Sequence, residues 1–277
     1  MGLSTSVQIA RYYDFFRDKE IAFTKANLQS LRIDPRQIYI KCQGDQWPCL
    51  INSASLQMAK ILIGTGTGIF SQIAKKKDIS LSLRFCFMGD DGDNIQFFVN
   101  CVVDKIDLYQ NTDKLALVTL NFTQKPPEEL ILRIGEFIET SENFKNRKEE
   151  RILITPESLR KLLIEKEETL IYIDNVPRRC ILKNVSFGGA KVMLVGVPKF
   201  LIGKPINLKL EFTDMSTPLH IAGVIPHADF LEGRKDIASV NIAFLSEAIP
   251  MQYKFHINNF IVNHQKNMLN SNAANQA

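Results

Sequence analysis

Two short segments of this chain resemble each other, and this resemblance constrains the fold more than any other feature of the sequence. The segment CLINSASLQMAKILI begins at Cys49, and CILKNVSFGGAKVML begins at Cys180. When Cys49 is aligned with Cys180, identical residues pair Ser55 with Ser186, Ala59 with Ala190, and Lys60 with Lys191. We therefore predict two copies of one β-barrel module, although alternating apolar strands can also resemble each other by convergence.

The expected secondary structure repeats in the same order. Alternating apolar residues predict strands in the first half at 37–42, 48–52, 58–63, 79–88, 95–108 and 115–123. In the second half they predict strands at 169–174, 178–184, 190–194, 206–212, 219–227 and 237–245. Helices are expected at 7–31, 126–138, 155–164 and 250–264. The predicted fold class is mainly β with flanking helices, as two antiparallel β-barrel modules in tandem.

Composition narrows the class of protein without naming a function. The 277 residues are 45% hydrophobic and 23% charged, and the net charge of +4 is spread along the chain. The five cysteines form no CxxC pair, so we expect buried free thiols in a reducing compartment. The first residues do not resemble a secretory signal, and no apolar stretch is long enough to cross a bilayer. We expect a cytoplasmic protein.

Two short clusters supply chemistry suited to a guanine-containing phosphodiester. Arg147-Lys-Glu-Glu-Arg151 offers two guanidiniums four residues apart, and each can bind phosphate oxygens or the O6/N7 edge of guanine. Asn184-Val-Ser186-Phe-Gly-Gly189 places an amide, a hydroxyl and glycines at a turn between two strands. Taken separately, the arginines could be a solvated helix end paired with neighbouring glutamates, and the second cluster an ordinary hairpin turn.

No catalytic or metal site is evident in the sequence. Gly64-Thr-Gly-Thr-Gly68 lacks the spacing of a phosphate-binding P-loop and is expected to be a flexible loop. The spacing of the four histidines gives no metal-ligand cluster. No serine or cysteine lies in a nucleophile elbow. We therefore expect neither an enzyme nor a metalloprotein.

The two clusters together, RxxxR followed by [DN]xSxxG, resemble the signature of PilZ domains, which are bacterial receptors for cyclic-di-GMP. The arrangement of a motif-free module before a motif-bearing one is similar to the two-domain PilZ receptors of spirochaetes, the PlzA type. The resemblance implies ligand-binding roles for Arg147, Arg151, Asn184, Ser186 and Gly189. Additional contacts are expected from Asn146, Lys148, Gly188, Arg178 and Arg179, and Asn146 bears on how many ligand molecules bind.

The resemblance also implies a domain organisation. We expect an N-terminal PilZ-like barrel at 1–139, a linker with the RxxxR motif at 140–151, a C-terminal PilZ domain at 152–266 and a disordered tail at 267–277. The first barrel is expected to bind no ligand, because Ser53 and Met58 align with Asn184 and Gly189. Its Arg32-Ile-Asp-Pro-Arg36 also fits RxxxR but is interpreted as a coincidence, because it lies much closer to the aligned serine.

The implied function is a monomeric, cytoplasmic cyclic-di-GMP receptor with no other cofactor and no membrane association. The ligand would reorient the two domains and so control an unidentified protein effector in motility or virulence regulation. An alternative is a nucleic-acid-binding β-barrel protein that acts through basic residues at 75–77, 145–148 and 178–179.

Overall fold

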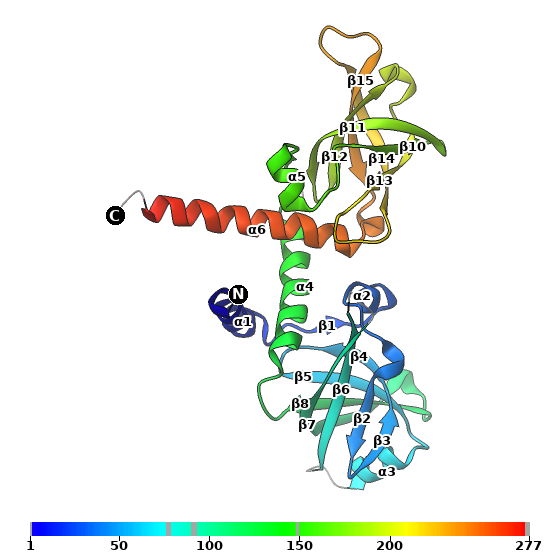
Figure 1. Cartoon of the computed structure of the whole chain (residues 1–277). Coiled ribbons are helices and arrows are strands. Elements are labelled where there is room, and N and C mark those ends of the chain that lie inside the picture. The colour runs from blue at the N-terminus through cyan, green and yellow to red at the C-terminus, as the bar shows by residue number, and fades with distance from the viewer. Residues whose placement is uncertain (1, 76–78, 90–92, 148–149, 275–277) are drawn as a thin grey trace. The chain divides into compact units, whose positions relative to one another are not determined.

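The chain divides into two compact units, Met1–Glu139 and Thr140–Ala277, here called the N-terminal and C-terminal units (Figure 1). The computed structural model describes residues 2–75, 79–89, 93–147 and 150–274. Within these residues, no helix combines the length and the apolar character needed to cross a membrane.

The N-terminal unit is built on one antiparallel sheet. Its strands follow the order β1-β4-β5-β8-β7-β6-β2-β3. Their bounds are β1 Ile21–Ala22, β2 Tyr39–Cys42, β3 Asp45–Pro48, β4 Leu50–Ala54, β5 Met58–Gly64, β6 Ser80–Met88, β7 Asn94–Leu108 and β8 Leu115–Phe122. The helices are α1 Gly2–Phe16, α2 Lys25–Ser30, α3 Gly68–Lys75 and α4 Glu128–Asn146, and α4 continues past the boundary between the units.

The C-terminal unit is a closed six-stranded barrel. The order is β10-β13-β14-β15-β12-β11, and β10 closes the barrel by pairing with both β13 and β11. The bounds are β9 Ile152–Leu153, β10 Glu168–Ile173, β11 Val176–Ser186, β12 Gly189–Val195, β13 Pro205–Leu210, β14 Leu219–Phe230 and β15 Ile237–Phe244. The short β9 adds to β11, and the helices are α5 Pro156–Leu162 and α6 Met251–Ala274.

The predicted duplication is confirmed by register as well as by strand order. β1 pairs Ile21 with Ala54, and β9 pairs Ile152 with Val185, which are equivalent positions when Cys49 is aligned with Cys180. Both units have a bulge at the same place, after Ile51 and after Leu182. The long β11 corresponds to β3 and β4 together, which are divided after Pro48, a residue with no N–H to donate to a ladder.

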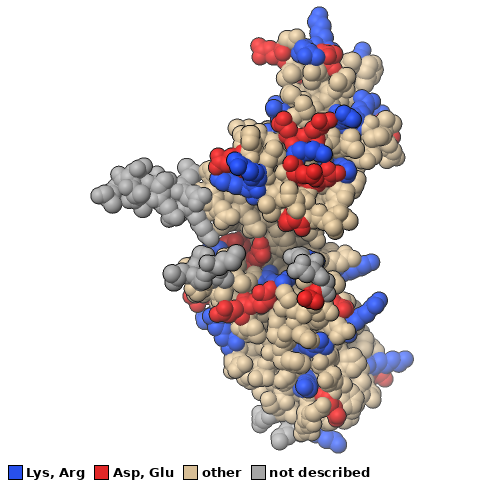
Figure 2. All heavy atoms as spheres, viewed as in Figure 1, with Lys and Arg blue, Asp and Glu red and all other residues tan. Residues whose placement is uncertain are grey.

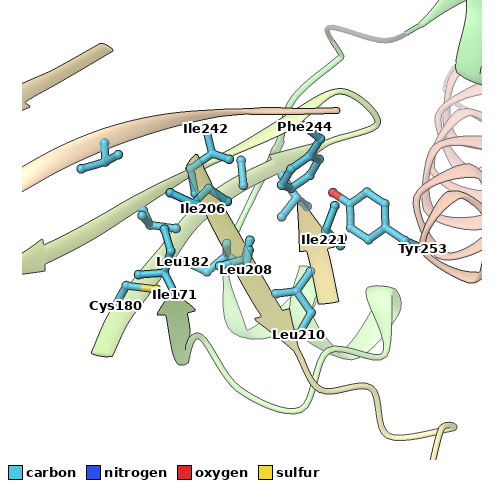
Figure 3. Packing of buried hydrophobic residues seen from close by; sticks show 14 of the residues in the cluster. Ile171, Cys180, Leu182, Ile206, Leu208, Leu210, Ile221, Ile242, Phe244 and Tyr253 are labelled. Carbon is cyan, nitrogen blue, oxygen red and sulfur yellow. The ribbon is translucent and has the colours of Figure 1, made fainter. Parts of the chain in front are cut away.

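Period-two alternation places the core of the C-terminal unit inside its barrel. β15 alternates half-buried and buried residues along its whole length, as a strand with one inward face requires. Figure 3 shows the inward side chains of several strands meeting, with Tyr253 of α6 beside Phe244. The Tyr253 hydroxyl donates to the main-chain carbonyl of Ser186 at 2.7 Å, so the core holds the end of β11 in place.

The first expected helix was wrong in its extent. The span 7–31 is divided into α1, β1 and α2, because Ile21 and Phe23 are buried at alternate positions, which is a strand pattern. Thr24 then begins α2 by accepting from the Asn27 N–H. α4 and α6 run past the ends expected near 138 and 264, and neither helix has a glycine or proline in the added part to stop it.

Candidate functional site

The turn between β11 and β12 forms one edge of a small depression of about 200 Å³. Asn184 and Ser186 lie two residues apart on β11 and so share a face of the strand, and Gly189 opens β12 directly opposite Ser186. The lining residues are Arg151, Asn184, Ser186, Gly188, Gly189, Ala190, Pro226, Asn241, Ile242 and Ala243. Four of the five residues expected to bind the ligand are therefore brought together, and Arg147 is not among them.

Ser186 is fixed by the turn that it helps to form. This residue is 6% exposed, and its hydroxyl donates to the carbonyl of Gly189 at 3.3 Å. Ser55 holds the corresponding turn of the N-terminal unit by accepting from the main-chain N–H groups of Gln57 and Met58. A serine at this position is thus part of the scaffold in both units.

The packing of the strands requires a glycine at position 189, for a reason that the sequence alone did not reveal. A Cβ at this position would lie 2.2 Å from the carbonyl oxygen of Ile242 on the adjacent β15. Backbone that close to a Cβ cannot be accommodated without moving a strand. Gly189 is therefore required by β15, and its lack of a side chain also keeps the depression open.

Arg151 lies immediately before β9, which pairs Leu153 with Asn184. Its side chain is exposed and also borders a second depression of about 650 Å³ lined by parts of β9, α5 and α6. Among the described residues, no carboxylate forms an ion pair with Arg151. The guanidinium is therefore available to an anion at the junction of the two depressions.

Arg147 directly follows α4, and its N–H donates to the carbonyl of Asn143. Its guanidinium lies 3.8 Å from the Glu150 carboxylate. The Nη1 atom is buried and has no hydrogen-bond partner in the part of the chain that the structure describes. A buried donor without an acceptor is costly, so this arginine would gain from a ligand oxygen.

The remaining expected contacts lie at other places. Asn146 is exposed at the last position of α4. Lys148 lies outside the described residues. Arg178 and Arg179 lie at the start of β11 and do not line the depression, and Arg179 forms an exposed ion pair with Glu168 at 3.5 Å.

Motif reasoning did not find the lining residues that come from β14 and β15, which are Pro226, Asn241, Ile242 and Ala243. These strands reach the turn because β15 pairs with β12 along its whole length. The register of β12 and β15 would have predicted these residues. Once Gly189 is paired with Ala243, Asn241 must lie beside Lys191.

In the N-terminal unit, the position of Arg151 is held by Glu20, by the same alignment of Cys49 with Cys180. Its carboxylate accepts from the Ser53 hydroxyl and forms an ion pair with Lys60 at 2.9 Å. Burial alone would raise the pKa of Glu20, but the Ser53 hydrogen bond and the Lys60 ammonium hold that pKa below its ordinary value. The same backbone position thus carries an ion-paired carboxylate in the N-terminal unit and a guanidinium in the C-terminal unit.

Met58 does not close the corresponding turn of the N-terminal unit. A depression of about 490 Å³ lies there, lined in part by Ser55, Gln57 and Met58. Glu20 and Ser53, the counterparts of Arg151 and Asn184, do not line this depression, so it matches the one in the C-terminal unit only at the turn itself.

The other RxxxR pair lies in a different part of the fold. Arg32 follows α2 with φ 54°, as Leu163 follows α5 with φ 59°, and it donates to the carbonyl of Gly89. The arginines that precede β9 therefore correspond to Phe16 and Glu20 and not to Arg32 and Arg36.

The described residues offer neither a metal-binding cluster nor a reactive cysteine thiol. They contain no group of three or more histidine, cysteine or acidic side chains arranged to hold a metal. All five cysteines are free and buried, as expected. Burial raises the pKa of Cys49, Cys101 and Cys180 to about 12, so these thiols stay protonated.

Comparison with known proteins gives matches over both units. Residues 7–141 match the PilZN3 domain family. A protein of Treponema denticola described as a cyclic di-GMP binding protein is 36% identical over 262 residues, which are 94% of this chain and 83% of that protein. Among solved structures, Borreliella burgdorferi PlzA in complex with c-di-GMP is 22% identical, covers 92% of this chain and 99% of its own, and has a TM-score of 0.41. Escherichia coli YcgR in complex with c-di-GMP is 12% identical, covers 99% of this chain and 95% of its own, and has a TM-score of 0.27.

Proposed function

The chain belongs to the family of two-domain PilZ proteins, and from that premise we propose that it is a receptor that binds cyclic-di-GMP at its C-terminal unit. The observation that carries the proposal is the meeting of Arg151, Asn184, Ser186 and Gly189 on one depression. The relative from Treponema denticola, described as a cyclic di-GMP binding protein, supports the choice of ligand.

The chemistry of the depression suits one guanine nucleotide of the ligand. Arg151 offers a planar donor fork for a phosphate or for the O6/N7 edge of guanine. The Asn184 amide adds a donor and an acceptor, and Gly189 leaves room for close approach. The volume of about 200 Å³ is below the range usual for ligand pockets, so the second nucleotide would extend past Arg151 toward the larger depression.

Arg147 would complete the site when ligand is present. Its buried Nη1 atom gains an acceptor if a ligand phosphate replaces the Glu150 carboxylate at 3.8 Å. Because Arg147 directly follows α4, moving this arginine acts on a helix whose first half carries buried residues of the N-terminal unit, such as Ile131 and Ile134. We propose that ligand binding in this way changes the orientation of the two units and thereby controls a protein effector.

Other parts of the proposal follow from this role. A second-messenger receptor needs no catalytic group, and cyclic-di-GMP signalling together with five reduced thiols suits the cytoplasm. The alternative of a nucleic-acid-binding protein has less support. Figure 2 shows acidic and basic side chains interspersed over the visible face, and the net charge is only +4.

Calorimetric titration with cyclic-di-GMP tests the proposal. The wild-type protein should bind, and Arg147→Ala and Asn184→Ala should each weaken binding by about tenfold or more, because each removes contacts worth about 1–3 kcal/mol. An unmodified chain that shows no heat of binding contradicts the proposal. Small-angle scattering with and without ligand tests the reorientation, and identical profiles would exclude it.

A further inference from the structure

Three side chains form a row across the outer face of the C-terminal barrel. Asn184 on β11 is directly opposite Lys191 on β12, and Lys191 is directly opposite Asn241 on β15. Directly opposed residues of antiparallel strands point to the same face, with their Cβ atoms about 5 Å apart. All three are half-buried, while Val185, Ala190 and Ile242 in the next row are buried. Lys191 therefore lies between two amides that both line the depression.

The charge at this row is uncompensated within the described ranges, where neither Arg151 nor Lys191 has an acidic partner. In the N-terminal unit the positions of Arg151 and Lys191 are held by Glu20 and Lys60, which form an ion pair at 2.9 Å. The same backbone positions in the C-terminal unit carry two cations. Two cations at positions close enough for an ion pair repel each other unless an anion lies between them.

The asparagines Asn184 and Asn241 are also unusual residues for positions within β-strands. Asparagine is depleted in strands, because its side chain favours turns. The C-terminal unit nevertheless has asparagine on both sides of Lys191, whereas the N-terminal unit has Ser53 and Thr119 on the two sides of Lys60. Threonine at 119 is a good strand former, so the structural demand of this row can be met without an amide.

We infer that Lys191 and Asn241 are ligand-binding residues of the C-terminal unit, an inference that rests on the proposed function and deepens it. The Lys191 ammonium binds a phosphate of cyclic-di-GMP together with Arg151. The Asn241 amide donates to the acceptor edge of a guanine on the opposite side of the depression from Asn184. Neither residue belongs to the RxxxR or [DN]xSxxG pattern.

The first test compares Lys191→Ala with Lys60→Ala, its matched control in the other unit. Calorimetric titration with cyclic-di-GMP is carried out at 50 and 200 mM salt. Lys191→Ala should weaken binding about tenfold and lose part of the salt dependence, because one phosphate contact is removed. Lys60→Ala should bind as the wild type does. Equal affinities of Lys191→Ala and wild type at both salt concentrations would overturn the role of Lys191.

Charge reversal separates a binding defect from a folding defect. Lys191→Glu places a carboxylate opposite the Arg151 guanidinium and so creates an opposite-charge pair, like the pair of Glu20 with Lys60. The variant should therefore melt at or above the wild-type temperature while binding at least 100-fold more weakly. Retained binding in a variant that is as stable as the wild type contradicts the inference.

Asn241→Ala is tested against Thr119→Ala, with cyclic-di-AMP as a second probe. Asn241→Ala should weaken cyclic-di-GMP binding about tenfold and reduce its preference over cyclic-di-AMP, because adenine presents a donor where guanine presents an acceptor. An unchanged preference would overturn the role of Asn241. Absence of cyclic-di-GMP binding in the wild-type protein overturns the proposed function itself, whereas wild-type binding with unaffected Lys191 and Asn241 variants overturns only this inference.

Discussion

The N-terminal and C-terminal units share strand order, register and even the position of a bulge, but they differ in the few side chains that face the turn after β4 and β11. The exchanged pairs are Glu20 with Arg151, Ser53 with Asn184, Met58 with Gly189 and Thr119 with Asn241. The turn serine and the following lysine are the same in both units. A shared strand order and register therefore do not imply a shared site, which depends on the side chains that the strands carry.

The comparison also shows that the charge of the lysine is balanced within the N-terminal unit but not within the C-terminal unit. Glu20 already holds Lys60 and Ser53, so the N-terminal unit has an internal acceptor where the C-terminal unit has the two cations Arg151 and Lys191. The depression of about 490 Å³ beside the turn of the N-terminal unit is lined by neither Glu20 nor Ser53. The charges at the equivalent positions therefore distinguish the two units.

The largest effect is expected from giving the C-terminal unit the acidic residue of the N-terminal one. Arg151→Glu replaces the available guanidinium with a carboxylate beside Lys191, so cyclic-di-GMP binding should weaken by more than 100-fold, because an attraction becomes a repulsion. Calorimetry measures the affinity, and circular dichroism checks the fold. The control is Glu20→Gln, which should leave the affinity unchanged. Equal affinity of Arg151→Glu and wild type would be incompatible with the account.

Exchanging the glycine for the methionine of the other unit should affect both folding and binding. In Gly189→Met, the new Cβ meets the Ile242 carbonyl oxygen at 2.2 Å, so we expect a loss of about 1–3 kcal/mol in the free energy of unfolding and binding weakened at least tenfold. Urea denaturation and calorimetry measure the two effects. Met58→Ala should change the affinity little, and an unperturbed Gly189→Met protein would refute the steric argument.

A smaller change in affinity is expected from the amide. Asn184→Ser introduces the residue found at the same place in the N-terminal unit and removes the amide that we propose hydrogen-bonds to the ligand. Binding should weaken about tenfold, with no loss of thermal stability, because the half-buried side chain faces outward. Ser53→Ala is the control, and it should leave the affinity for cyclic-di-GMP intact. An unaltered affinity in Asn184→Ser would remove Asn184 from the site.

The smallest effect concerns the acid stability of the N-terminal unit. The pKa of Glu20 is lowered in the folded protein, so its contribution to stability is present above the unfolded pKa of about 4.3 and is lost as the pH falls through the folded value. The carboxylate is partly exposed, so this contribution is below about 1 kcal/mol. Glu20→Gln should therefore be slightly less stable than wild type at pH 7, and urea melts should show that difference shrinking as the pH falls below about 4.3. A stability difference that does not depend on pH would contradict this assignment.

Much of the fold was predictable because its signals are local and repeated. The repeated segment and the strand alternation predicted two barrels, and both motif clusters fall where the strands begin or end. The helix expected at 7–31 was wrong because Ile21 and Phe23 are two residues apart, which is a strand spacing, although each also lies seven residues from another apolar residue, Leu28 or Phe16. Only the pairing of β1 with β4 decides between the two.

The site was predictable only in part, because much of its lining comes from distant sequence. Arg151, Asn184, Ser186 and Gly189 lie within two short motifs. Asn241 enters through the pairing of β12 with β15, which no local pattern specifies. The counterpart of Arg151, Glu20, was also missed, because it has the opposite charge and lies outside the repeated segment that begins at Cys49. Neighbouring residues are nevertheless identical in the two halves, for example Ile21 with Ile152 and Thr24 with Thr155.

Hydrogen exchange followed by mass spectrometry, with and without cyclic-di-GMP, tests the central claim most directly, because it reports on both turns in one experiment. The account predicts slower exchange on ligand addition at the β11–β12 turn, 184–191, and at 150–153, and no change at the matching turn, 53–60. Protection of 53–60 with unchanged exchange at 184–191 would contradict it.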